Sequence, residues 1–506
     1  MSTPSEQETP ARSRRSWAII AGPALALVVY FFLPEVYTDI QGGQQTFSHA
    51  GRATTAIAVW MAVWWLTEAI SIYATALVPL AAFPMTGASS IAEASAPYAN
   101  NIIFLFMGGF FMALAMQRWN LHRRIALVAL SMVGERPSHM IGGFMVVAAV
   151  LSMWVSNTAT AVMMLPVALS VIELVDSKAQ DAWSDLSRNH FAIALLLGIA
   201  YSCSVGGMVT PIGTPPNLFL VSFADETLGV EVSFVRWMMM GIPLALVFLP
   251  IIWWLLTARL HPVPTTPVEG GREMVRRELQ KLGSLSRGER VVFVVFCSAC
   301  LSWVFRPLLD DITIAGFTPL AGLSDAGIAM IAAMLLFAIP VDPSNMTLDW
   351  ETAVKLPWGI LLLFGGGLSL AGAIASNGVS EWLGAQSASL NGLPSVLMVL
   401  AVVTGMVFLT ELTSNTASAA ALIPILAAIA PGLGIEPLVL ALPATFAACC
   451  AFMLPVATPP NAVVFGSGRV GMREMARAGL LLNFISIVLI TILTFVLARP
   501  LLSGLQ

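Results

Sequence analysis

Charged side chains are scarce in this sequence. Asp, Glu, Lys and Arg together make up 10% of its 506 residues, whereas hydrophobic residues make up 58%. Soluble globular proteins carry about 25% charged residues, so this composition excludes an ordinary water-soluble protein. Runs of about 20 apolar residues can cross a bilayer as helices, because a helix satisfies its own backbone polar groups. We therefore predict an all-α polytopic membrane protein.

Chemically reactive side chains are also few. The five cysteines lie in apolar surroundings, and Cys297-x-x-Cys300 lacks the turn residues of a redox motif, so we interpret them as small apolar side chains. The membrane segments contain no His-Glu motif, no paired Asp and no Ser-His pattern, which argues against an intramembrane enzyme. The net charge of -4 indicates no nucleic-acid partner.

What the sequence does contain is an internal repeat. The tripeptide Ser-Asn-Thr occurs at 156–158 and again at 414–416, and the motif Thr-Pro-Pro-Asn follows each copy, at 214–217 and 458–461. A single Ser-Asn-Thr could have a purely structural role, in which its side chains hydrogen-bond neighbouring membrane helices. Two copies with matching partners are typical of a repeated structural unit.

Polar stretches divide the chain into four parts. These are a cytoplasmic tail at 1–16, the first membrane helix with the first repeat at 17–257, a cytoplasmic linker at 258–290, and the second repeat at 291–506. One helix plus five in each repeat gives about eleven spanning helices by apolar run length. Each repeat also carries a broken segment, at about 139–172 and 393–430.

An odd number of spanning helices places the two termini on opposite sides of the membrane. With the N-terminus inside, most of the 24 Lys and Arg residues fall on the cytoplasmic side, as the positive-inside rule requires. The exceptions are Arg52, Arg236, Arg306 and Arg499. We therefore expect a plasma (inner) membrane protein with a cytoplasmic N-terminus and a C-terminus on the outer side. Because each repeat has an odd number of spanning helices, five, the second repeat starts on the opposite side of the membrane from the first. The two repeats are therefore inverted relative to each other, as in secondary transporters.

The first Ser-Asn-Thr lies near the middle of a segment, 139–172, that is too long for one straight helix. Arg136 and Lys178 flank this segment and are expected on the same side of the membrane, so a re-entrant hairpin fits better. Non-helical backbone at such a tip is tolerated at membrane depth only where it lines a cavity or is buried in protein.

Proline pairs predict breaks in the helices that carry Thr-Pro-Pro-Asn. Pro215 and Pro216 remove two N–H donors and leave the carbonyl groups of 212–214 free. Carbonyl, hydroxyl and amide oxygens suit a hard cation such as sodium, and half-helix N-termini suit an anion. No Lys, Arg or His stands near either Ser-Asn-Thr. We therefore expect the charge of a bound carboxylate to be met by cations, helix dipoles and Asn or Thr donors.

Two acidic residues, Glu68 and Glu411, stand inside apolar runs and are functional candidates for that reason. Glu68 fits a helix-end carboxylate equally well. Glu411 precedes Ser414 by three residues, so it is better suited to bracing the second hairpin or tuning a cation site than to contacting an anion.

These motifs resemble the divalent-anion:sodium symporter family, which transports dicarboxylates, citrate or sulfate. The resemblance covers nearly the whole chain from about residue 17. It rests on WLTEAI at 65–70, the two Ser-Asn-Thr copies, TPIGTPPN at 210–217 and LPVATPPNA at 454–462. It implies that Ser-Asn-Thr forms the tips of two re-entrant hairpins. It also implies a homodimer and an elevator mechanism, in which a transport domain slides against a scaffold.

The resemblance also implies which residues bind the ligands. The first sodium site would use Ser152, Ser156, Asn157 and Gly213, and the second would use Thr410, Ser414, Asn415 and Ala457. The substrate carboxylates would be held by Asn157, Thr158, Asn415 and Thr416, with Thr214 and Thr458 close by. Sodium is the expected coupling ion, and no organic cofactor is expected.

The predicted function is sodium-coupled symport of C4-dicarboxylates such as succinate, malate and fumarate into the cell. Alternatives on the same scaffold are a sodium-independent dicarboxylate exchanger and a citrate or sulfate symporter. Some exchangers in the family have altered cation-site side chains, so the presence of Ser152, Thr410 and both Asn residues favours sodium coupling. A passive anion channel is a further alternative, against which the inverted repeat argues.

Overall fold

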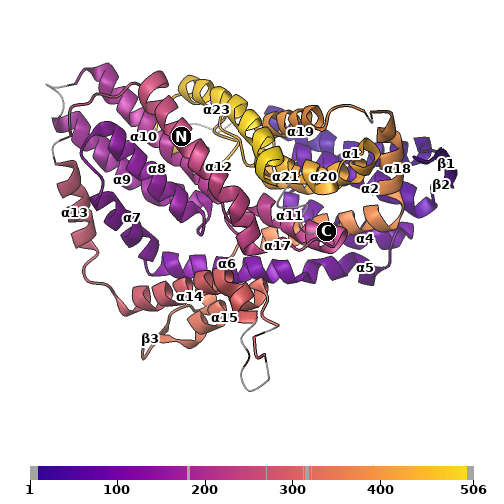
Figure 1. The fold of residues 1–506 in the computed structure, drawn as a ribbon, viewed down its shortest axis with the longest axis horizontal. Helices are drawn as coiled ribbons and strands as arrows, with labels where there is room; N and C mark the ends of the chain where they lie inside the picture. Colours follow the sequence, from indigo (N-terminus) through magenta and orange to yellow (C-terminus); the bar gives the residue numbers. More distant parts are fainter. Residues whose placement is uncertain are drawn as a thin grey trace, which may run out of the picture.

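The computed structural model describes residues 9–178, 183–268, 270–310, 313, 318–320, 322–390 and 392–498. Part of the predicted tail, Arg499 and the C-terminus lie outside the described residues. Figure 1 shows an elongated, almost wholly helical molecule, with α7–α10 and α13 gathered at one end and α18 near β1 and β2 at the other.

The first half of the chain forms a series of helices, with one small β-hairpin between α1 and α2. Its elements are α1 (Thr9–Phe32), β1 (Val36–Thr38), β2 (Gln44–Thr46), α2 (His49–Thr67), α3 (Ile72–Thr75), α4 (Val78–Thr86), α5 (Ile91–Ser95), η1 (Ala96–Ala99), α6 (Asn101–Arg118), α7 (Leu121–Ser131), α8 (Pro137–Ser152), α9 (Asn157–Lys178), α10 (Asp185–Gly207), α11 (Pro215–Leu228), α12 (Phe234–Trp254) and the π-helical turn η2 (Leu255–Leu260). Helix α1 therefore begins inside the predicted tail.

The linker contains one amphipathic helix, and the second half repeats the helical plan. The elements are α13 (Gly271–Lys281), α14 (Arg287–Asp310), α15 (Asp325–Ala338), β3 (Pro340–Asp342), β4 (Asn345–Met346), α16 (Trp350–Ala353), α17 (Trp358–Ser376), α18 (Val379–Ser387), η3 (Ala388–Leu390), α19 (Ser395–Thr410), α20 (Asn415–Ile429), η4 (Pro431–Leu433), α21 (Pro437–Ala448), α22 (Pro459–Gly466), α23 (Met472–Leu493) and η5 (Thr494–Ala498). The strands pair antiparallel as β1 with β2 and β3 with β4. Neither hairpin was predicted from the sequence.

Seven helices within the described residues are long and apolar enough to cross a membrane. They are Ile91–Arg118, Asn157–Lys178, Asp185–Gly207, Phe234–Leu260, Arg287–Arg306, Trp358–Ser376 and Met472–Leu497. The pair Val379–Leu390 and Ser395–Thr410, bent by 116°, would make an eighth as a broken span or re-entrant loop. The prediction of a helical, multi-pass membrane protein is confirmed. The count of about eleven stays a prediction, because helices such as α8, α20 and α21 are apolar but shorter than a full span.

Helix starts follow the local sequence. The Ser233 hydroxyl accepts the N–H of Arg236 at the start of α12, and Ser324 does the same for Gly327 at the start of α15. A serine at this position satisfies an N–H group that has no partner within the helix. Pro215 begins α11, where its missing N–H costs nothing.

Small residues allow close helix contacts in the core. Helix α6 packs against α15, and a Cβ added at Gly108 would lie 2.7 Å from the Ala329 backbone. Helix α8 packs against α10, and a Cβ at Gly206 would lie 2.2 Å from the Ala149 carbonyl oxygen. Such spacing is characteristic of membrane helices, whose association depends on close packing.

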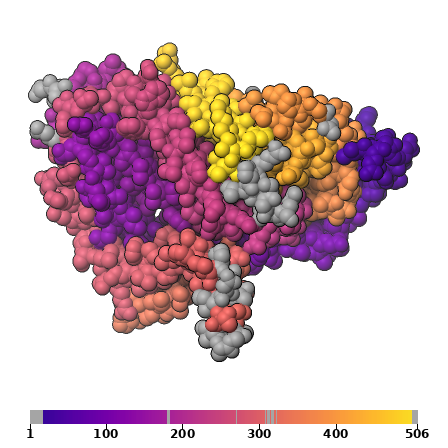
Figure 2. Space-filling model, in the orientation of Figure 1, coloured from indigo at the N-terminus to yellow at the C-terminus, as the bar shows by residue number. Residues whose placement is uncertain are grey.

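The two halves interlock. Helix α9 of the first half packs against α22 of the second, and α20 of the second packs against α11 of the first. Helix α23 also lies along α12 (Figure 1). In the space-filling view the yellow C-terminal segment lies between the magenta surface of the first half and the orange surface of the second (Figure 2). Each Ser-Asn-Thr helix therefore lies beside the Thr-Pro-Pro-Asn helix of the other half.

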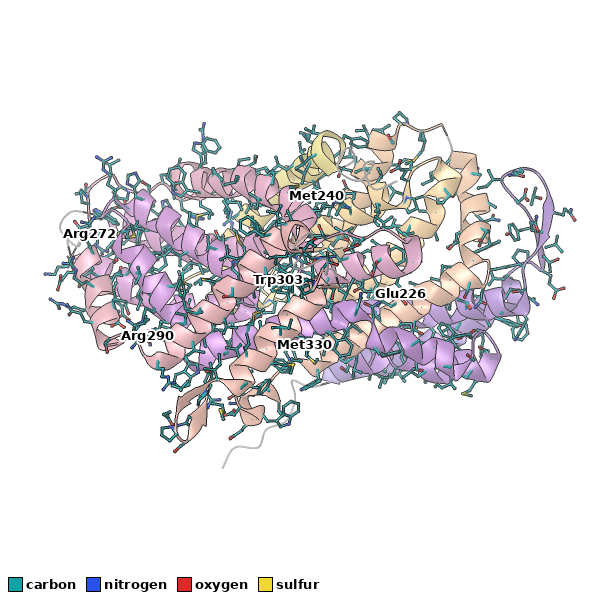
Figure 3. All side chains as sticks on the ribbon, turned by 60° about the horizontal axis from the view of Figure 1, so that its bottom comes forward. Glu226, Met240, Arg272, Arg290, Trp303 and Met330 are labelled. Atoms are coloured by element: carbon teal, nitrogen blue, oxygen red, sulfur yellow. The ribbon has the colours of Figure 1, made fainter. Side chains whose placement is uncertain are left out.

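An aromatic stack anchors the first Ser-Asn-Thr to neighbouring helices. The rings of Phe234 and Trp303 lie 4.5 Å apart and nearly parallel, and Trp154 stacks on Phe234 at 6.0 Å. Trp303 lies near the middle of the molecule in Figure 3. Because Trp154 precedes Ser156 by two residues, this stack fixes the position of the tip against α12 and α14.

Candidate functional site

The first Ser-Asn-Thr forms the break between α8 and α9. The Ser152 hydroxyl, at the end of α8, lies 2.5 Å from Asn157 Oδ1 and 2.8 Å from the Cys203 carbonyl oxygen. The Ser156 hydroxyl accepts the N–H of Ala159 at 3.3 Å. Hydroxyl, amide and carbonyl oxygens therefore converge where α8 ends and α9 begins.

The second Ser-Asn-Thr repeats this geometry. The Thr410 hydroxyl, at the end of α19, lies 2.5 Å from Asn415 Oδ1 and 2.9 Å from the Ala448 carbonyl oxygen. The Ser414 hydroxyl caps α20 by accepting the N–H of Ala417 at 3.5 Å. The two copies of Ser-Asn-Thr in the sequence therefore make the same side-chain contacts in the structure.

The Thr-Pro-Pro-Asn motifs form matching breaks between α10 and α11 and between α21 and α22. Thr214 and Thr458 precede the new helices in extended conformation, with φ of -148° and -139°. Both threonines are buried. The helix therefore stops and restarts where the prolines predict.

The asparagine of each Thr-Pro-Pro-Asn motif holds its break together. Asn217 Nδ2 donates to the carbonyl oxygens of Gly207 and Thr210, both at 2.9 Å. Asn461 Nδ2 donates to those of Ala451 and Leu454, at 3.2 and 3.1 Å. These asparagines were not among the site residues predicted from the sequence. Their repeated place in the motif was the available signal.

The first group of predicted cation ligands comes together around Gly207. A Cβ at Gly207 would lie 2.5 Å from Asn157 Oδ1, and a Cβ at Gly213 would lie 2.4 Å from the Gly207 carbonyl oxygen. Asn157 and Gly213 therefore both lie against Gly207, and Asn157 also contacts Ser152.

The second group is brought together in part. Thr410 contacts Asn415 directly, and Ser414 begins the same helix turn. Ala457 lies buried in the loop between α21 and α22, where its N–H donates to the Leu454 carbonyl oxygen at 3.2 Å.

Two buried amide oxygens near the helix breaks are not fully used as hydrogen-bond acceptors. Asn461 Oδ1 is buried without a hydrogen-bond partner among the described residues. Its counterpart Asn217 Oδ1 lies 3.8 Å from the Cys449 thiol, a weak donor. No cluster of three His, Cys, Asp or Glu residues with metal-binding geometry occurs in the part of the chain that the structure describes. Neutral oxygens of this kind fit a monovalent hard cation.

The predicted substrate residues lie at the helix starts. Asn157 and Asn415 are partly buried, Thr158 is exposed and Thr416 is partly buried, so all four keep some accessible surface. They occupy the first turns of α9 and α20, whose N-termini carry partial positive charge. This arrangement offers donors to an anion without a cationic side chain.

Glu411 braces the loop that leads to Ala457. Its side chain is 3% exposed. Oε1 accepts the N–H of Phe452 at 2.7 Å and Nδ2 of Asn483 at 2.8 Å, and Oε2 accepts the N–H of Leu454 at 3.2 Å. These contacts join Glu411, at the end of α19, to the loop 452–454 and to Asn483 on α23, a residue that was not predicted from the sequence. The bracing of the second hairpin stays a prediction.

Glu68 lies at the end of α2 rather than inside a helix. It has left-handed backbone torsions, with φ 47° and ψ 40°, and its N–H donates to the Trp64 carbonyl oxygen. Its side chain is exposed. Of the two interpretations offered for this acid, the position fits the helix-end carboxylate.

Comparison of the sequence with known protein families identifies one that matches this chain. A family model described as the sodium:sulfate symporter transmembrane region matches residues 22–503. The chain belongs to this family. The resemblance seen in the sequence motifs is thereby confirmed, and this member of the sodium:sulfate symporter family is a transporter rather than an enzyme.

Relatives of this symporter family member are similar over nearly their full length. The sodium-dependent dicarboxylate transporter SdcS of Staphylococcus saprophyticus is 40% identical over 491 residues, covering 96% of this chain and 92% of the relative. SdcS of Staphylococcus aureus (strain USA300) is 39% identical over 497 residues, covering 97% and 92%.

Solved transporter structures share the fold of this symporter family member. The YdaH transporter of Alcanivorax borkumensis aligns with a TM-score of 0.58 at 12% identity, covering 97% of this chain and 98% of that one. MtrF of Neisseria gonorrhoeae aligns with a TM-score of 0.59 at 11% identity, covering 96% and 95%. At these identities the likeness concerns the fold alone.

Proposed function

We propose that this protein is a secondary active transporter that uses sodium to drive C4-dicarboxylates into the cell. The observation that carries the proposal is the duplicated hydroxyl–asparagine contact at the ends of α8 and α19, each beside a broken helix. The names of the relatives, sodium-dependent dicarboxylate transporters, support the same substrate and ion.

Two sodium sites are proposed, one in each half. The first uses Ser152, Ser156, Asn157 and Gly213, and the second uses Thr410, Ser414, Asn415 and Ala457. Their oxygens are neutral, so a bound sodium ion leaves each site with a net positive charge. That charge would then attract the substrate.

The substrate is proposed to bind between the two tips. Asn157, Thr158, Asn415 and Thr416 supply donors from the starts of α9 and α20, with Thr214 and Thr458 beside them. No Lys, Arg or His occurs in 140–177 or 395–430. Dicarboxylate binding therefore depends on prior sodium binding, which is the physical basis of coupling.

The larger organisation is part of the proposal. We expect a homodimer in the plasma (inner) membrane, with the N-terminus in the cytoplasm, the C-terminus outside and the linker 258–290 in the cytoplasm. Two inverted repeats, each with a re-entrant hairpin, would form a transport domain that slides against a scaffold. The interlocking of α9 with α22 and of α20 with α11 supports movement of both tips as one body.

Sulfate is a second candidate substrate, because the family model carries that name. The relatives at 40% and 39% identity favour dicarboxylates instead. Competition by sulfate or citrate against labelled succinate would rank the three anions.

The test is uptake of radiolabelled succinate into liposomes that contain the purified protein. An inward sodium gradient is expected to drive accumulation above equilibrium, whereas an equal choline gradient is not. Uptake that requires internal dicarboxylate and ignores sodium would identify an exchanger. Uptake that never exceeds equilibrium would identify a passive channel.

A further inference from the structure

A second feature of the molecule is a basic cavity, whose lining residues are far in the sequence from both Ser-Asn-Thr tripeptides. It has a volume of about 270 Å³ and is lined by the start of α10, the end of η2 and the start of α23. Helix α12, which continues as η2, packs against both α10 and α23, and the three helices run side by side in Figure 1. The cavity therefore forms where segments of the two halves meet.

Two arginines supply the positive charge of this cavity. Arg473 and Arg477 both line it, and they lie one helical turn apart on α23. Neither forms an ion pair with any residue that the structure describes. Like charges at this spacing repel each other, so a bound anion would relieve an existing repulsion.

Glu474, the acidic residue of the lining, forms no ion pair with either arginine within the part of the chain that the structure describes. Glu474 lies between the two arginines in sequence, but its carboxylate turns back toward the start of its own helix. A Cβ added at Gly471 would lie 2.2 Å from Glu474 Oε2. A carboxylate in the first turn is stabilised by the helix dipole, which accounts for this orientation.

Two histidines complete the polar wall. The rings of His190 and His261 lie 5.4 Å apart, and His190 Nδ1 donates to the Pro262 carbonyl oxygen at 3.4 Å. His261 is 8% exposed, and its Nδ1 has no hydrogen-bond partner among the described residues. Burial and the neighbouring His190 lower the pKa of His261 to about 4, against a smaller opposing effect of Glu474. The imidazole is therefore neutral at pH 7, and the arginines carry the charge.

We propose that this cavity is a second anion site, which binds a phosphate or carboxylate group between Arg473, Arg477 and the His190–His261 wall. Guanidinium groups pair with such oxyanions through two parallel hydrogen bonds. The volume suits either a small soluble anion or the headgroup of an anionic lipid. The site differs from the proposed transport site in using cationic side chains and in needing no sodium.

The experiment measures anion binding to the purified full-length protein in sodium-free choline buffer. Inorganic phosphate and citrate are titrated separately by calorimetry. Phosphatidylglycerol retained from mixed phosphatidylglycerol–phosphatidylcholine nanodiscs is measured by native mass spectrometry. The double variant Arg473→Gln/Arg477→Gln is expected to weaken anion binding at least about tenfold. Each hydrogen bond between a guanidinium group and the anion contributes to the affinity, and the variant removes both arginines.

Arg469→Gln is the matched control, because Arg469 lies nearby but pairs with Asp176 at 3.1 Å, outside the cavity lining. It removes one positive charge and is expected to leave binding unchanged. Thermal unfolding of all variants checks that each is folded.

The outcomes separate the two sources of the anion. Binding of free phosphate or citrate that the double variant loses supports a soluble ligand. Lipid retention alone, lost in the same variant, supports a headgroup. The proposal is overturned if the wild-type protein binds none of the three probes, or if the double variant binds them as well as the Arg469→Gln control.

Discussion

At the scale of single residues, the two tips share one unusual contact, in which a hydroxyl at the end of one helix meets the amide oxygen of the asparagine that starts the next. Ser152 with Asn157 and Thr410 with Asn415 are both separated by 2.5 Å. These oxygens carry no charge of their own. Any cation they hold must therefore be bound by several of them together.

The asparagines should be indispensable. We expect Asn157→Ala or Asn415→Ala to lower sodium-driven succinate uptake at least about tenfold, because hydrogen bonds to charged groups contribute about 1.5–3 kcal/mol. Uptake is measured in liposomes, with thermal unfolding to confirm that each variant is folded. Near-normal uptake by either variant would exclude that asparagine from the site.

The Thr410 hydroxyl offers a finer test of the second cation site. Thr410→Ser keeps the hydroxyl, as Ser152 does naturally, and should leave sodium activation close to that of the wild type. Thr410→Ala removes it and should raise the half-saturating sodium concentration about tenfold, for the same energetic reason. Equal sodium activation curves for the two variants would show that the hydroxyl does not bind the ion.

At the scale of elements, the loop between α21 and α22 depends on one carboxylate. Glu411 accepts the N–H groups of Phe452, Met453 and Leu454, and Asn483 reaches it from α23. This one side chain therefore joins three elements of the second half.

Glu411→Gln should destabilise the protein. The amide places an NH₂ group against backbone N–H donors, and leaving buried donors without an acceptor costs about 1–3 kcal/mol. We expect a lower thermal unfolding midpoint in detergent and a weaker response to sodium. Glu351→Gln, at an exposed position on α16, is the control and should change neither. An unchanged midpoint for Glu411→Gln would mean that the loop holds without the carboxylate.

The elements differ in how far the sequence could predict them. Prolines and the repeated Ser-Asn-Thr are local signals, and they located the breaks at α8–α9, α10–α11, α19–α20 and α21–α22. Glu411 braces 452–454 and accepts a hydrogen bond from Asn483, so these contacts join residues far apart in the chain, which no periodic pattern reveals. Asn217 and Asn461 were missed because their role depends on carbonyls seven and ten residues earlier. The short strands β1–β4 carry too few residues for an alternating pattern.

At the scale of the whole molecule, the linker is fastened to the first half. Arg124 on α7 pairs with Glu289 at 2.6 Å and donates to the carbonyl oxygens of Leu282, Gly283 and Ser284. Arg272 and Arg290, at either side of this contact in the chain, lie at the same end of the molecule in Figure 3. These two basic residues thus lie at the end of the molecule where the Arg124–Glu289 ion pair fastens the linker.

The proposed orientation can be tested in intact bacterial cells. Starting from a variant without the five native cysteines, Gln41→Cys between β1 and β2 should react with a membrane-impermeant maleimide. Gln280→Cys, in the linker helix α13, should react only after the cells are permeabilised. Labelling of Gln280→Cys in intact cells, with Gln41→Cys protected, would reverse the orientation.

The two halves share the hydroxyl–asparagine contact at their tips, but they differ in the residue next to that contact. Where the second half has Glu411, the equivalent position of the first half is Met153, whose carbonyl oxygen accepts the Thr210 hydroxyl. If the two inverted halves were identical, a two-fold rotation about an axis in the membrane plane would convert the inward-open carrier into the outward-open one, and the two would have equal energy. A fixed carboxylate in one half alone removes that degeneracy. We therefore expect the empty carrier to rest facing one side of the membrane. The difference between Met153 and Glu411 would determine which side that is.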